Sequence, residues 1–267
     1  MHARTTPHLA LVILPLALPL LAISGPAAHA QVDPAAGPYG RLGGGIDWPE
    51  STGFADDNCA SQQPAALFGC RAGNNGRPLG ASGSFDPALV VEGAVGYRFN
   101  RWIRAEALLS WRPDLDFSGQ SNFLGAAGPN QPVGAKASSL AGFGVAYLDL
   151  PRLGKVRPFV GAGLGVARNR IDSLNFSFPG ISPTATTATP AGSSTGMAYL
   201  LTAGFSIPLG AKLDLDIAYR FSDLGSITTG SGQAQIVRPA GSFAFPIGGT
   251  NGQLQAHGVT MGLRFAF

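Results

Sequence analysis

Charged side chains are scarce in this sequence. Asp, Glu, Lys and Arg together make up 12% of its 267 residues, about half of the usual ~25%. The formal net charge is only +3, and nucleic-acid binding relies on clustered Lys and Arg, so we expect no nucleic-acid partner. Low charge combined with 38 glycines, without apolar residues at helical spacing, also argues against an ordinary soluble enzyme.

Long apolar runs are missing beyond the first 30 residues. Those 30 residues contain a basic position, an almost wholly apolar stretch at 9–23 and a small-x-small site at 28–30, which is the layout of a secretory signal peptide. The apolar stretch is shorter than the ~20 residues that a membrane-spanning helix needs, and it holds two prolines. We therefore predict a signal peptide over 1–30 and a single mature domain over 31–267.

Cysteine is rare as well. Cys59 and Cys70 are the only two, and they lie in a stretch rich in Gly, Asn and Pro with no His nearby. We expect no metal site there, because a structural metal needs more ligands. An exported protein meets oxidising conditions, so a local disulfide is expected, with a contribution on the order of 3 kcal/mol.

Glycine-rich motifs do not indicate a cofactor. The segments RLGGGIDW and VGAGLGVA have glycine spacings like those of dinucleotide-binding loops. Both fall inside expected strands with no helix after them, and such loops work by placing a phosphate at a helix N-terminus. We expect no cofactor.

What the sequence does contain is alternation. The last eleven residues, HGVTMGLRFAF, carry an apolar side chain at every second position from Val259 to Phe267, which predicts a strand with two different faces. Seven more segments share the pattern, and with the last one the expected strands are 42–48, 89–99, 103–111, 141–147, 160–166, 199–207, 213–221 and 259–267.

The connections between these segments alternate in length. Tight turns are expected at 99–102, 150–156 and 208–212, and long connections near 49–84, 112–136, 171–196 and 225–256. Long structureless loops are unusual in a soluble domain, whereas membrane barrels carry short turns on the periplasmic side and long loops outside. We predict an all-β, eight-stranded antiparallel up-and-down transmembrane β-barrel with both termini periplasmic.

The second face of each expected strand carries the charges. In lipid the outward face must be apolar and all backbone groups must pair, so the charged face points inward. By alternation the interior receives five arginines and five carboxylates, namely Arg41, Asp47, Glu92, Arg98, Arg104, Glu106, Asp214, Asp216, Arg220 and Arg264.

Those ten charges are expected to fill the lumen. Eight strands enclose only enough space for side chains to meet, and buried charges are costly without partners. Glycines leave room for the arginines, at 43, 45, 142, 144, 161, 163 and 165. The alternative is a narrow passive channel lined by the same charges.

Aromatic residues mark both ends of the strands, as at the two interfaces of a membrane barrel. At the short-turn end we expect Tyr97, Phe99, Tyr147, Phe205, Phe265 and Phe267, and at the long-connection end Trp48, Trp111, Tyr199, Tyr219 and Phe221.

The signal peptide, the eight-strand rhythm and the closing GVTMGLRFAF together resemble the small outer-membrane β-barrel proteins of Gram-negative bacteria. That family includes the transmembrane domain of OmpA, the opacity-type proteins and the major surface antigens of alphaproteobacteria. The resemblance covers 31–267 and implies an outer-membrane location with lipid and lipopolysaccharide as partners. It also implies that Leu263, Phe265 and Phe267 form the signal read by the barrel-assembly machinery. No peptidoglycan-binding domain is expected after the last strand.

The resemblance leaves the function open. We expect a structural or surface-interaction role (envelope integrity, surface antigen or adhesin), with host or surface ligands reached through loops such as the Ser/Thr/Pro/Ala-rich tract 176–196. Arg168 and Arg170 continue the lipid-facing alternation of 160–166 to its outer end. They either contact lipopolysaccharide phosphates, which suit Arg, or are simply solvated.

A lipid A-modifying enzyme is the third candidate. Catalysis would need a nucleophile beside a base, and His257 is the only histidine after residue 30. Ser222 and Asp223 lie on the neighbouring strand, but Ser222 has lumen parity and His257 lipid parity, so they should point apart. We expect no catalytic residue and no enzymatic activity.

Overall fold

The computed structural model describes residues 36–57, 72, 76–122 and 130–267, and every regular element in those ranges is a β-strand. None of the described residues belongs to a helix long and apolar enough to cross a membrane. The expected signal peptide, Cys59 and Cys70 lie outside the described residues.

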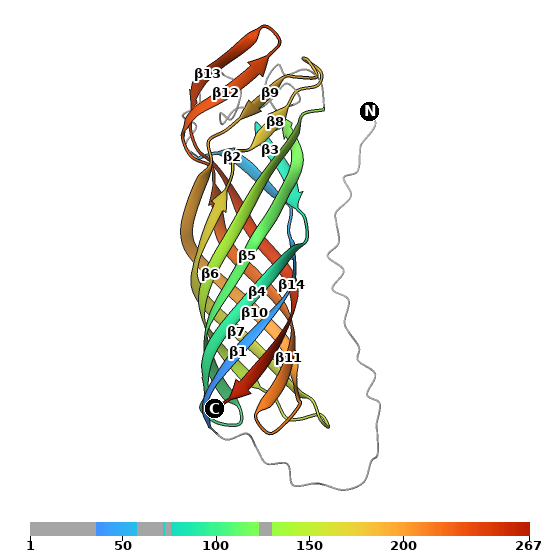
Figure 1. Ribbon diagram of the computed structural model, residues 1–267, viewed down its shortest axis with the longest axis vertical. Helices are drawn as coiled ribbons and strands as arrows, with labels where there is room; N and C mark the ends of the chain where they lie inside the picture. Colours follow the sequence, from blue (N-terminus) through green and yellow to red (C-terminus); the bar gives the residue numbers. More distant parts are fainter. Residues whose placement is uncertain (1–35, 58–71, 73–75, 123–129) are drawn as a thin grey trace, which may run out of the picture. The chain divides into compact units, whose positions relative to one another are not determined.

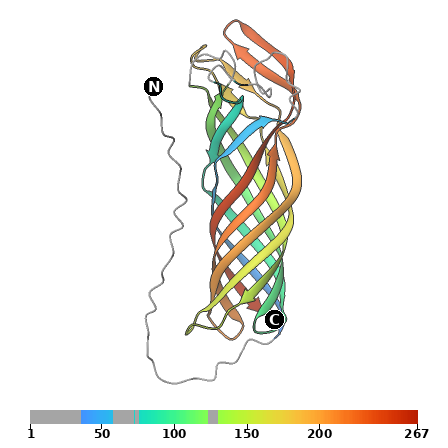
Figure 2. The same ribbon diagram turned by 180° about the vertical axis from the view of Figure 1, so that it is seen from behind.

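Eight long strands form a closed ring (Figures 1 and 2). Each is antiparallel to the next, and β1 pairs with β14 over Tyr39–Pro49 to close the ring. Closure pairs the backbone groups that an open edge would leave free. The ring consists of β1 (Gly37–Pro49), β4 (Ala88–Arg98), β5 (Ile103–Asn122), β6 (Pro132–Asp149), β7 (Arg157–Ile171), β10 (Gly192–Pro208), β11 (Leu213–Thr228) and β14 (Thr250–Ala266). The predicted fold class is confirmed.

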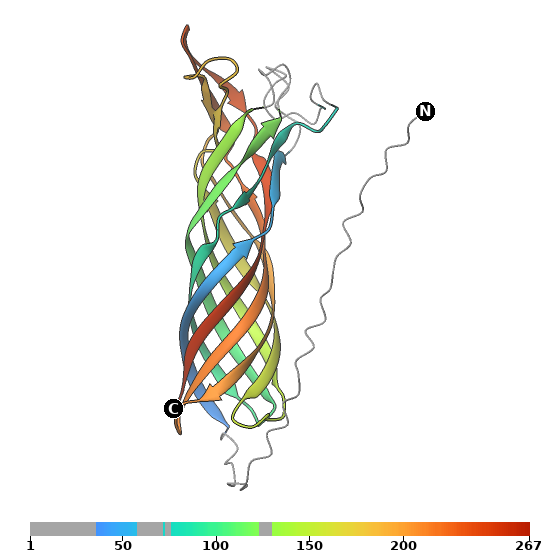
Figure 3. The same cartoon turned by 90° about the vertical axis from the view of Figure 1, so that its right-hand side faces the viewer.

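Short strands occupy parts of the connections expected to be structureless. β2 and β3 pair with each other and with the ends of β14 and β5, while β8, β9, β12 and β13 continue from β6. They lie at the end of the barrel away from the C-terminus (Figures 1 and 3). Their bounds are β2 (Thr52–Asp56), β3 (Gly80–Phe85), β8 (Asn175–Ser177), β9 (Thr186–Ala188), β12 (Gly232–Arg238) and β13 (Gly241–Ile247).

The ring strands also run further than expected, and β5 shows why. Its alternation is interrupted by an irregularity between Arg112 and Leu115, after which pairing with β6 resumes. Arg112 and Leu115 both point inward, each 1% exposed, although they have opposite parity. A bulge inserts an extra residue and resets the alternation, so a strictly periodic pattern appears to stop at 111.

The inward and outward faces of the sheet change polarity along the barrel. In the part nearer the chain's C-terminus the outward face is apolar, as at Leu109 (55% exposed), and the inward face is charged, as at Arg104 (1% exposed). Beyond the β5 bulge the order is reversed, because Leu115 and Phe117 point inward and Asp116 and Ser118 are exposed. The first part suits hydrocarbon outside the barrel and the second part suits water.

The interior of that second part is an apolar core. Phe117 packs against Phe54 and Phe85 with ring centroids 5.1 and 5.2 Å away. The cluster further includes Leu115, Val133, Ile171, Leu174, Phe176, Leu200, Leu224, Ile227 and Leu254. We call these twelve residues the apolar layer.

The face predicted for one strand is wrong. In β6 the residues Ala141, Phe143, Val145 and Tyr147 point into the barrel, 0–5% exposed, and Leu148 points out at 46%. Gly142 and Gly144 therefore face outward and leave no room inside, and Tyr147 does not belong to the aromatic residues of the short-turn end. Both faces of this segment are apolar, so the size of the side chains does not show which face meets lipid. Large side chains are also needed to fill the interior.

Candidate functional site

The barrel interior below the apolar layer holds the largest constellation of charges in the described residues. Nine of the ten predicted lumen charges are buried there at 6% exposure or less, and the tenth, the side chain of Asp214, is 31% exposed. Three further buried charges, Arg112, Asp149 and Arg157, were not predicted. The expected balance of five against five therefore does not hold, since the described interior has more arginines than carboxylates.

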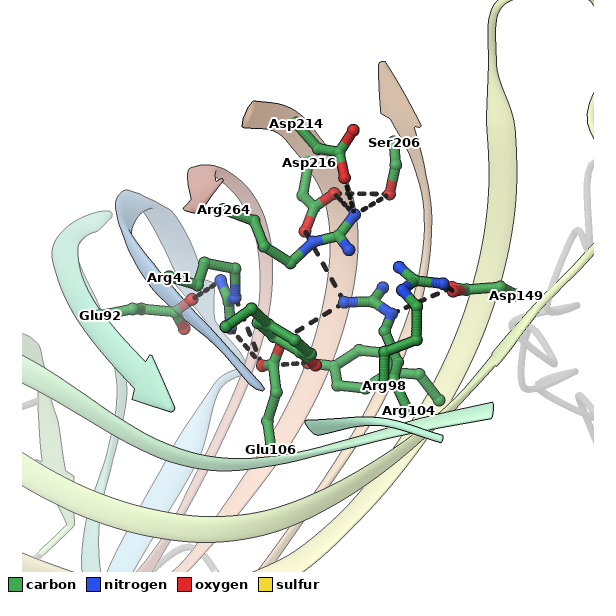
Figure 4. A network of polar contacts seen from close by, with 12 residues as sticks. Arg41, Glu92, Arg98, Arg104, Glu106, Asp149, Ser206, Asp214, Asp216 and Arg264 are labelled. Atoms are coloured by element: carbon green, nitrogen blue, oxygen red, sulfur yellow. Dashed lines mark hydrogen bonds and ion pairs between the residues drawn. The ribbon is translucent and has the colours of Figure 1, made fainter. Parts of the chain in front are cut away.

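Glu106 on β5 lies at the centre of this network (Figure 4). Arg41 from β1 donates from Nη2 to its Oε2 at 3.1 Å, and Arg104 donates from Nη1 to its Oε1 at 3.3 Å. The hydroxyls of Tyr39 and Tyr147 donate to Oε1 and Oε2, both at 3.1 Å. Side chains of three strands, β1, β5 and β6, thus meet at one carboxylate.

Two glycines make room for those tyrosines. A Cβ at Gly96 would lie 2.4 Å from Cζ of Tyr39, and a Cβ at Gly161 would lie 2.7 Å from Cδ1 of Tyr147. Real Cβ atoms do not approach so closely, so each ring covers a position that only glycine leaves open. Gly96 and Gly161 are therefore packing positions for tyrosine rings.

Arg104 links Glu106 to the end of β6. Its Nε donates to Asp149 Oδ1 at 3.0 Å, and Arg98 Nη1 donates to Asp149 Oδ2 at 2.5 Å. The Arg104 guanidinium also lies over the rings of Tyr147 and Phe159, 4.1 and 4.7 Å from their centroids. A planar, delocalised cation stacked on aromatic faces is a favourable buried arrangement.

Asp216 on β11 connects Arg104 to the last strand. Arg264 on β14 donates to it from Nε and Nη2 at 3.0 and 3.1 Å, a two-pronged contact, and Arg104 Nη1 lies 3.7 Å away. Ser206 donates to Asp216 Oδ1 at 2.5 Å and accepts from Arg264 at 3.1 Å. Asp214 is a further partner of Arg264 at 3.0 Å.

On the opposite side the network continues through Glu92. Arg41 donates to Glu92 Oε2 at 3.2 Å, and Arg220 donates to the same oxygen at 3.2 Å and pairs with Oε1. Arg112 forms a separate pair with Asp47, Nε to Oδ2 at 2.6 Å. Strands from all around the ring are thereby joined across the lumen.

A cavity of about 10 Å³ lies between Arg41, Arg104, Asp216 and Arg220, which is room for about one water molecule. The carboxylates are engaged by arginines, so the arrangement is suited to filling and bracing the barrel. In the described residues no group of three or more His, Cys, Asp or Glu is placed to hold a metal ion.

The three buried charges that were not predicted differ in how clearly the sequence indicates them. Arg112 continues the inward alternation of Arg104 and Glu106, but it is the first residue of the long connection predicted at 112–136. Asp149 shares the parity of Tyr147, so reversing the face of β6 would have found it. Arg157 is buried at the start of β7, between the turn predicted at 150–156 and the strand predicted from 160.

The remaining predicted residues lie on the outside. Arg168 and Arg170 are exposed on the outward face of β7, and Leu263, Phe265 and Phe267 are exposed at 38–77%. These positions follow the predicted alternation.

His257 points outward and Ser222 inward at 2% exposure, so they lie on opposite faces of the sheet as alternation predicts. His257 Nδ1 is 2.5 Å from the Tyr219 hydroxyl, and its Nε2 is 2.7 Å from Glu50 Oε1. The histidine thus has two hydrogen-bond partners, and neither is the serine.

A closed ring of antiparallel strands with apolar outer and charged inner faces defines the class of outer-membrane barrels. Residues 16–267 match the model of the family described as outer membrane protein beta-barrel domain. The chain belongs to that family, which implies the bacterial outer membrane as its location.

Among curated proteins, the chain is similar to uncharacterized proteins of Brucella. It is 33% identical over 140 residues to one from Brucella abortus (strain 2308), with 48% of each chain covered, and the same values hold for one from Brucella suis biovar 1 (strain 1330). The chain thus spans about half the length of the curated relatives it matches.

Solved structures with a similar fold are bacterial outer-membrane proteins. The outer membrane protease OmpT from Escherichia coli has a TM-score of 0.48 at 7% identity, covering 88% of this chain and 97% of that one. OprG from Pseudomonas aeruginosa has a TM-score of 0.45 at 15% identity, with 89% and 100% covered. Neisserial surface protein A has a TM-score of 0.37 at 16% identity, with 87% and 99% covered.

Proposed function

We propose that this protein is a closed, non-conducting barrel of the outer membrane with a structural or surface-interaction role, in envelope integrity or as a surface antigen or adhesin. The observation that carries the proposal is the filling of the barrel at two successive levels. The ion-pair network around Glu106 occupies one level, and the apolar layer around Phe117 occupies the next. A solute would have to displace both.

Conductance in planar bilayers tests this closure. We expect no stable discrete steps from the refolded protein, with insertion verified by recovering the folded form from the membrane. A stable conductance that changes in Arg104→Ala or Asp216→Ala would establish instead the narrow passive channel, which is the second candidate function.

We propose further that the termini and short turns face the periplasm. The short connections after β4, β6 and β10 lie at the same end as the C-terminus (Figure 1), and this asymmetry is typical of outer-membrane barrels. An epitope inserted between Pro239 and Ala240 should bind antibody on intact cells. The same epitope between Gly154 and Lys155 should bind only after permeabilisation, and the reverse result would invert the orientation.

The surface role is proposed to involve the outer connections, including 176–196 with β8 and β9. Ile181 in this segment is 47% exposed, and such surfaces are where host or surface ligands would be met. Binding to host cells that is lost when 178–185 is replaced by a short Gly/Ser linker, while folding is kept, would support an adhesin. Undiminished binding would exclude this segment.

Export and the disulfide belong to the same proposal. Cleavage after Ala30 would leave Gln31 as the first residue, and a Cys59–Cys70 bridge would lower the mature mass by about two hydrogens. Intact mass before and after reduction measures both. An uncleaved chain, or a mass unchanged by reductant, would contradict the respective part.

We propose that Leu263, Phe265 and Phe267 act during assembly in the cell. Replacing Phe267 by Ala should reduce the folded form in cells but leave refolding into lipid vesicles unchanged. Equal losses in cells and in vesicles would mean that Phe267 is needed for the barrel itself.

We also propose that the protein is not an enzyme. The inward Ser222 cannot be activated by the outward His257, whose partners are Tyr219 and Glu50. Lipid A masses should be the same in cells expressing the protein, its His257→Gln variant or neither. A mass change that depends on His257 would favour the lipid-modifying enzyme.

A further inference from the structure

The outward face of β7 changes abruptly from apolar to basic. Leu164 and Val166 are 67% and 58% exposed, and the next two outward residues, Arg168 and Arg170, are also exposed. The outward faces of the neighbouring strands β6 and β10 change from apolar to polar at the same level. On β6 the outward residue before Leu140 is Ser138, and on β10 the outward residue before Met197 is Thr195.

The strand register surrounds the two arginines with hydroxyl groups. Arg168 is paired with Leu140 on β6 and Thr195 on β10, and Arg170 with Ser138 and Ser193. Directly opposite side chains of antiparallel strands have Cβ atoms about 4.5–5.5 Å apart. We call Ser138, Arg168, Arg170, Ser193 and Thr195 the β7 basic patch.

The two guanidiniums have no carboxylate partner in the described part of the chain. This distinguishes them from the buried arginines of the lumen, which pair with Asp or Glu. Asp172, two residues beyond Arg170, donates its backbone N–H to the backbone carbonyl of Lys136, whereas the carboxylate that pairs with the Lys136 side chain, at 3.6 Å, is that of Asp116. Among the described residues neither acid forms an ion pair with Arg168 or Arg170, so the patch keeps both positive charges.

A strip of small outward side chains runs along β6 and ends at Leu140, which is 46% exposed and paired with Arg168. Gly142 faces outward, and a Cβ added there would meet nothing within 4 Å. In the register it lies between Leu109 on β5 and Val166 on β7, which are 55% and 58% exposed. Gly144 and Ala146 continue the outward line towards the short-turn end. The surface below Leu140 is thus a shallow apolar furrow, flanked by Leu109 and Val166 at Gly142 and by Leu164 at Gly144.

We propose that the β7 basic patch binds the phosphate groups of lipid A in the outer leaflet, with an acyl chain lying along the β6 furrow. The inference rests on the proposed orientation, in which this end of β7 meets that leaflet. Arg forks match phosphate oxygens in two-pronged contacts, and the serine and threonine hydroxyls add donors. An amphiphile is favoured over free phosphate because the cationic and apolar surfaces are continuous.

Native mass spectrometry of the refolded full chain in detergent tests the proposal, with diphosphoryl lipid A as the probe. In Arg168→Gln/Arg170→Gln, the apparent affinity should fall about tenfold or more, since contacts between charged groups are being lost. Arg101→Gln/Lys155→Gln removes the same charge from the short-turn end and should bind as the unchanged protein does. Arg168→Lys/Arg170→Lys keeps the charge without the forks and should lie between.

Two comparisons identify the ligand chemistry. Lipid A stripped of its phosphates should bind the unchanged protein and the Gln variant equally. Millimolar inorganic phosphate should not displace diphosphoryl lipid A, and displacement would make the patch a general anion site and overturn the lipid assignment. Equal binding of diphosphoryl lipid A by the Gln variant and its charge-matched control would overturn the proposal altogether.

Failure here is distinguishable from failure of the proposed function. Conductance by the unchanged protein would refute the closed barrel without altering the lipid binding measured in detergent. An inverted epitope pattern would refute the orientation even if lipid A bound. The barrel could also be non-conducting and oriented as proposed while the Gln variant binds diphosphoryl lipid A as well as its control does. That result would refute only the assignment of the β7 basic patch.

Discussion

Glu106 shows how a buried carboxylate is accommodated in a narrow lumen. It is 4% exposed and accepts hydrogen bonds from two arginines and two tyrosines. Its contacts replace hydration on both oxygens, which is the condition under which a buried charge is tolerated. The arginines depend on Glu106 in turn, because they are equally desolvated.

Replacing Glu106 by Gln should therefore destabilise the barrel strongly. The change leaves Arg41 and Arg104 short of negative charge in the interior, and breaking a buried pair in this way costs about 3–5 kcal/mol. Urea unfolding of the protein refolded into lipid vesicles measures the loss.

Asp214→Asn is the matched control. Asp214 also pairs with an arginine, but its side chain is 31% exposed and Arg264 retains Asp216, so the loss should stay below about 1 kcal/mol. Similar losses in the two variants would show that burial of the network contributes little to stability.

Single residues were predictable where alternation was unbroken. Arg104, Glu106, Asp216 and Arg264 were assigned to the lumen from parity alone, because hydrocarbon on one side leaves a charge only one place to go. Their partners were not predictable, since parity says nothing of which strands face each other across the lumen. Asp149 was missed for a different reason, because its strand is apolar on both faces.

At the scale of elements, the alternation holds as long as both environments stay constant. β7, β10, β11 and β14 have the predicted faces along their apolar stretches. β5 departs from the prediction at its bulge, where the strand leaves the apolar surroundings and its interior changes from charged to apolar. Strict alternation ends at the bulge, and for this reason the sequence predicts loops where the outer parts of the strands lie.

The level at which the surroundings of the barrel change from hydrocarbon to water can be tested by placing an arginine at each of two outward positions. Ala162→Arg lies midway along the outward apolar stretch of β7 and should cost about 2–4 kcal/mol, as lipid-facing Arg does near the bilayer centre. Ser118→Arg lies outward on β5 beyond the bulge and should change stability by less than about 0.5 kcal/mol. Urea titrations in vesicles compare the two, and equal costs would mean that both positions meet the same surroundings.

For the whole molecule, the fold could be predicted because closure follows from the membrane itself. Eight alternating segments, short and long connections in turn, and the sorting of charges left a closed barrel as the consistent solution. The small outer strands and the apolar layer were not predictable, because residues such as Phe54 and Leu174 lie in connections without periodicity. Their positions depend on packing across the barrel mouth.

A closed barrel braced across its lumen should resist detergent. We expect the folded protein to migrate differently from the boiled protein on SDS gels, because unfolding requires the hydrogen bonds of the whole ring and the ion pairs to break together. The comparison is made on one refolded sample, divided and either heated or kept cold. Identical mobility would contradict a closed, braced ring.

The two filled levels predict that neither alone controls permeability. Arg104→Ala/Glu106→Ala removes one charge of each sign from the network, and Phe54→Ala/Phe117→Ala opens the apolar layer where two rings meet at 5.1 Å. Each double variant should remain silent in planar bilayers, because the other level still blocks the lumen, and the combined variant should conduct. Gel mobility before and after heating shows which variants are folded. Steady conductance from Arg104→Ala/Glu106→Ala alone would show that the apolar layer does not seal the barrel, and silence of a folded combined variant would show that further side chains do.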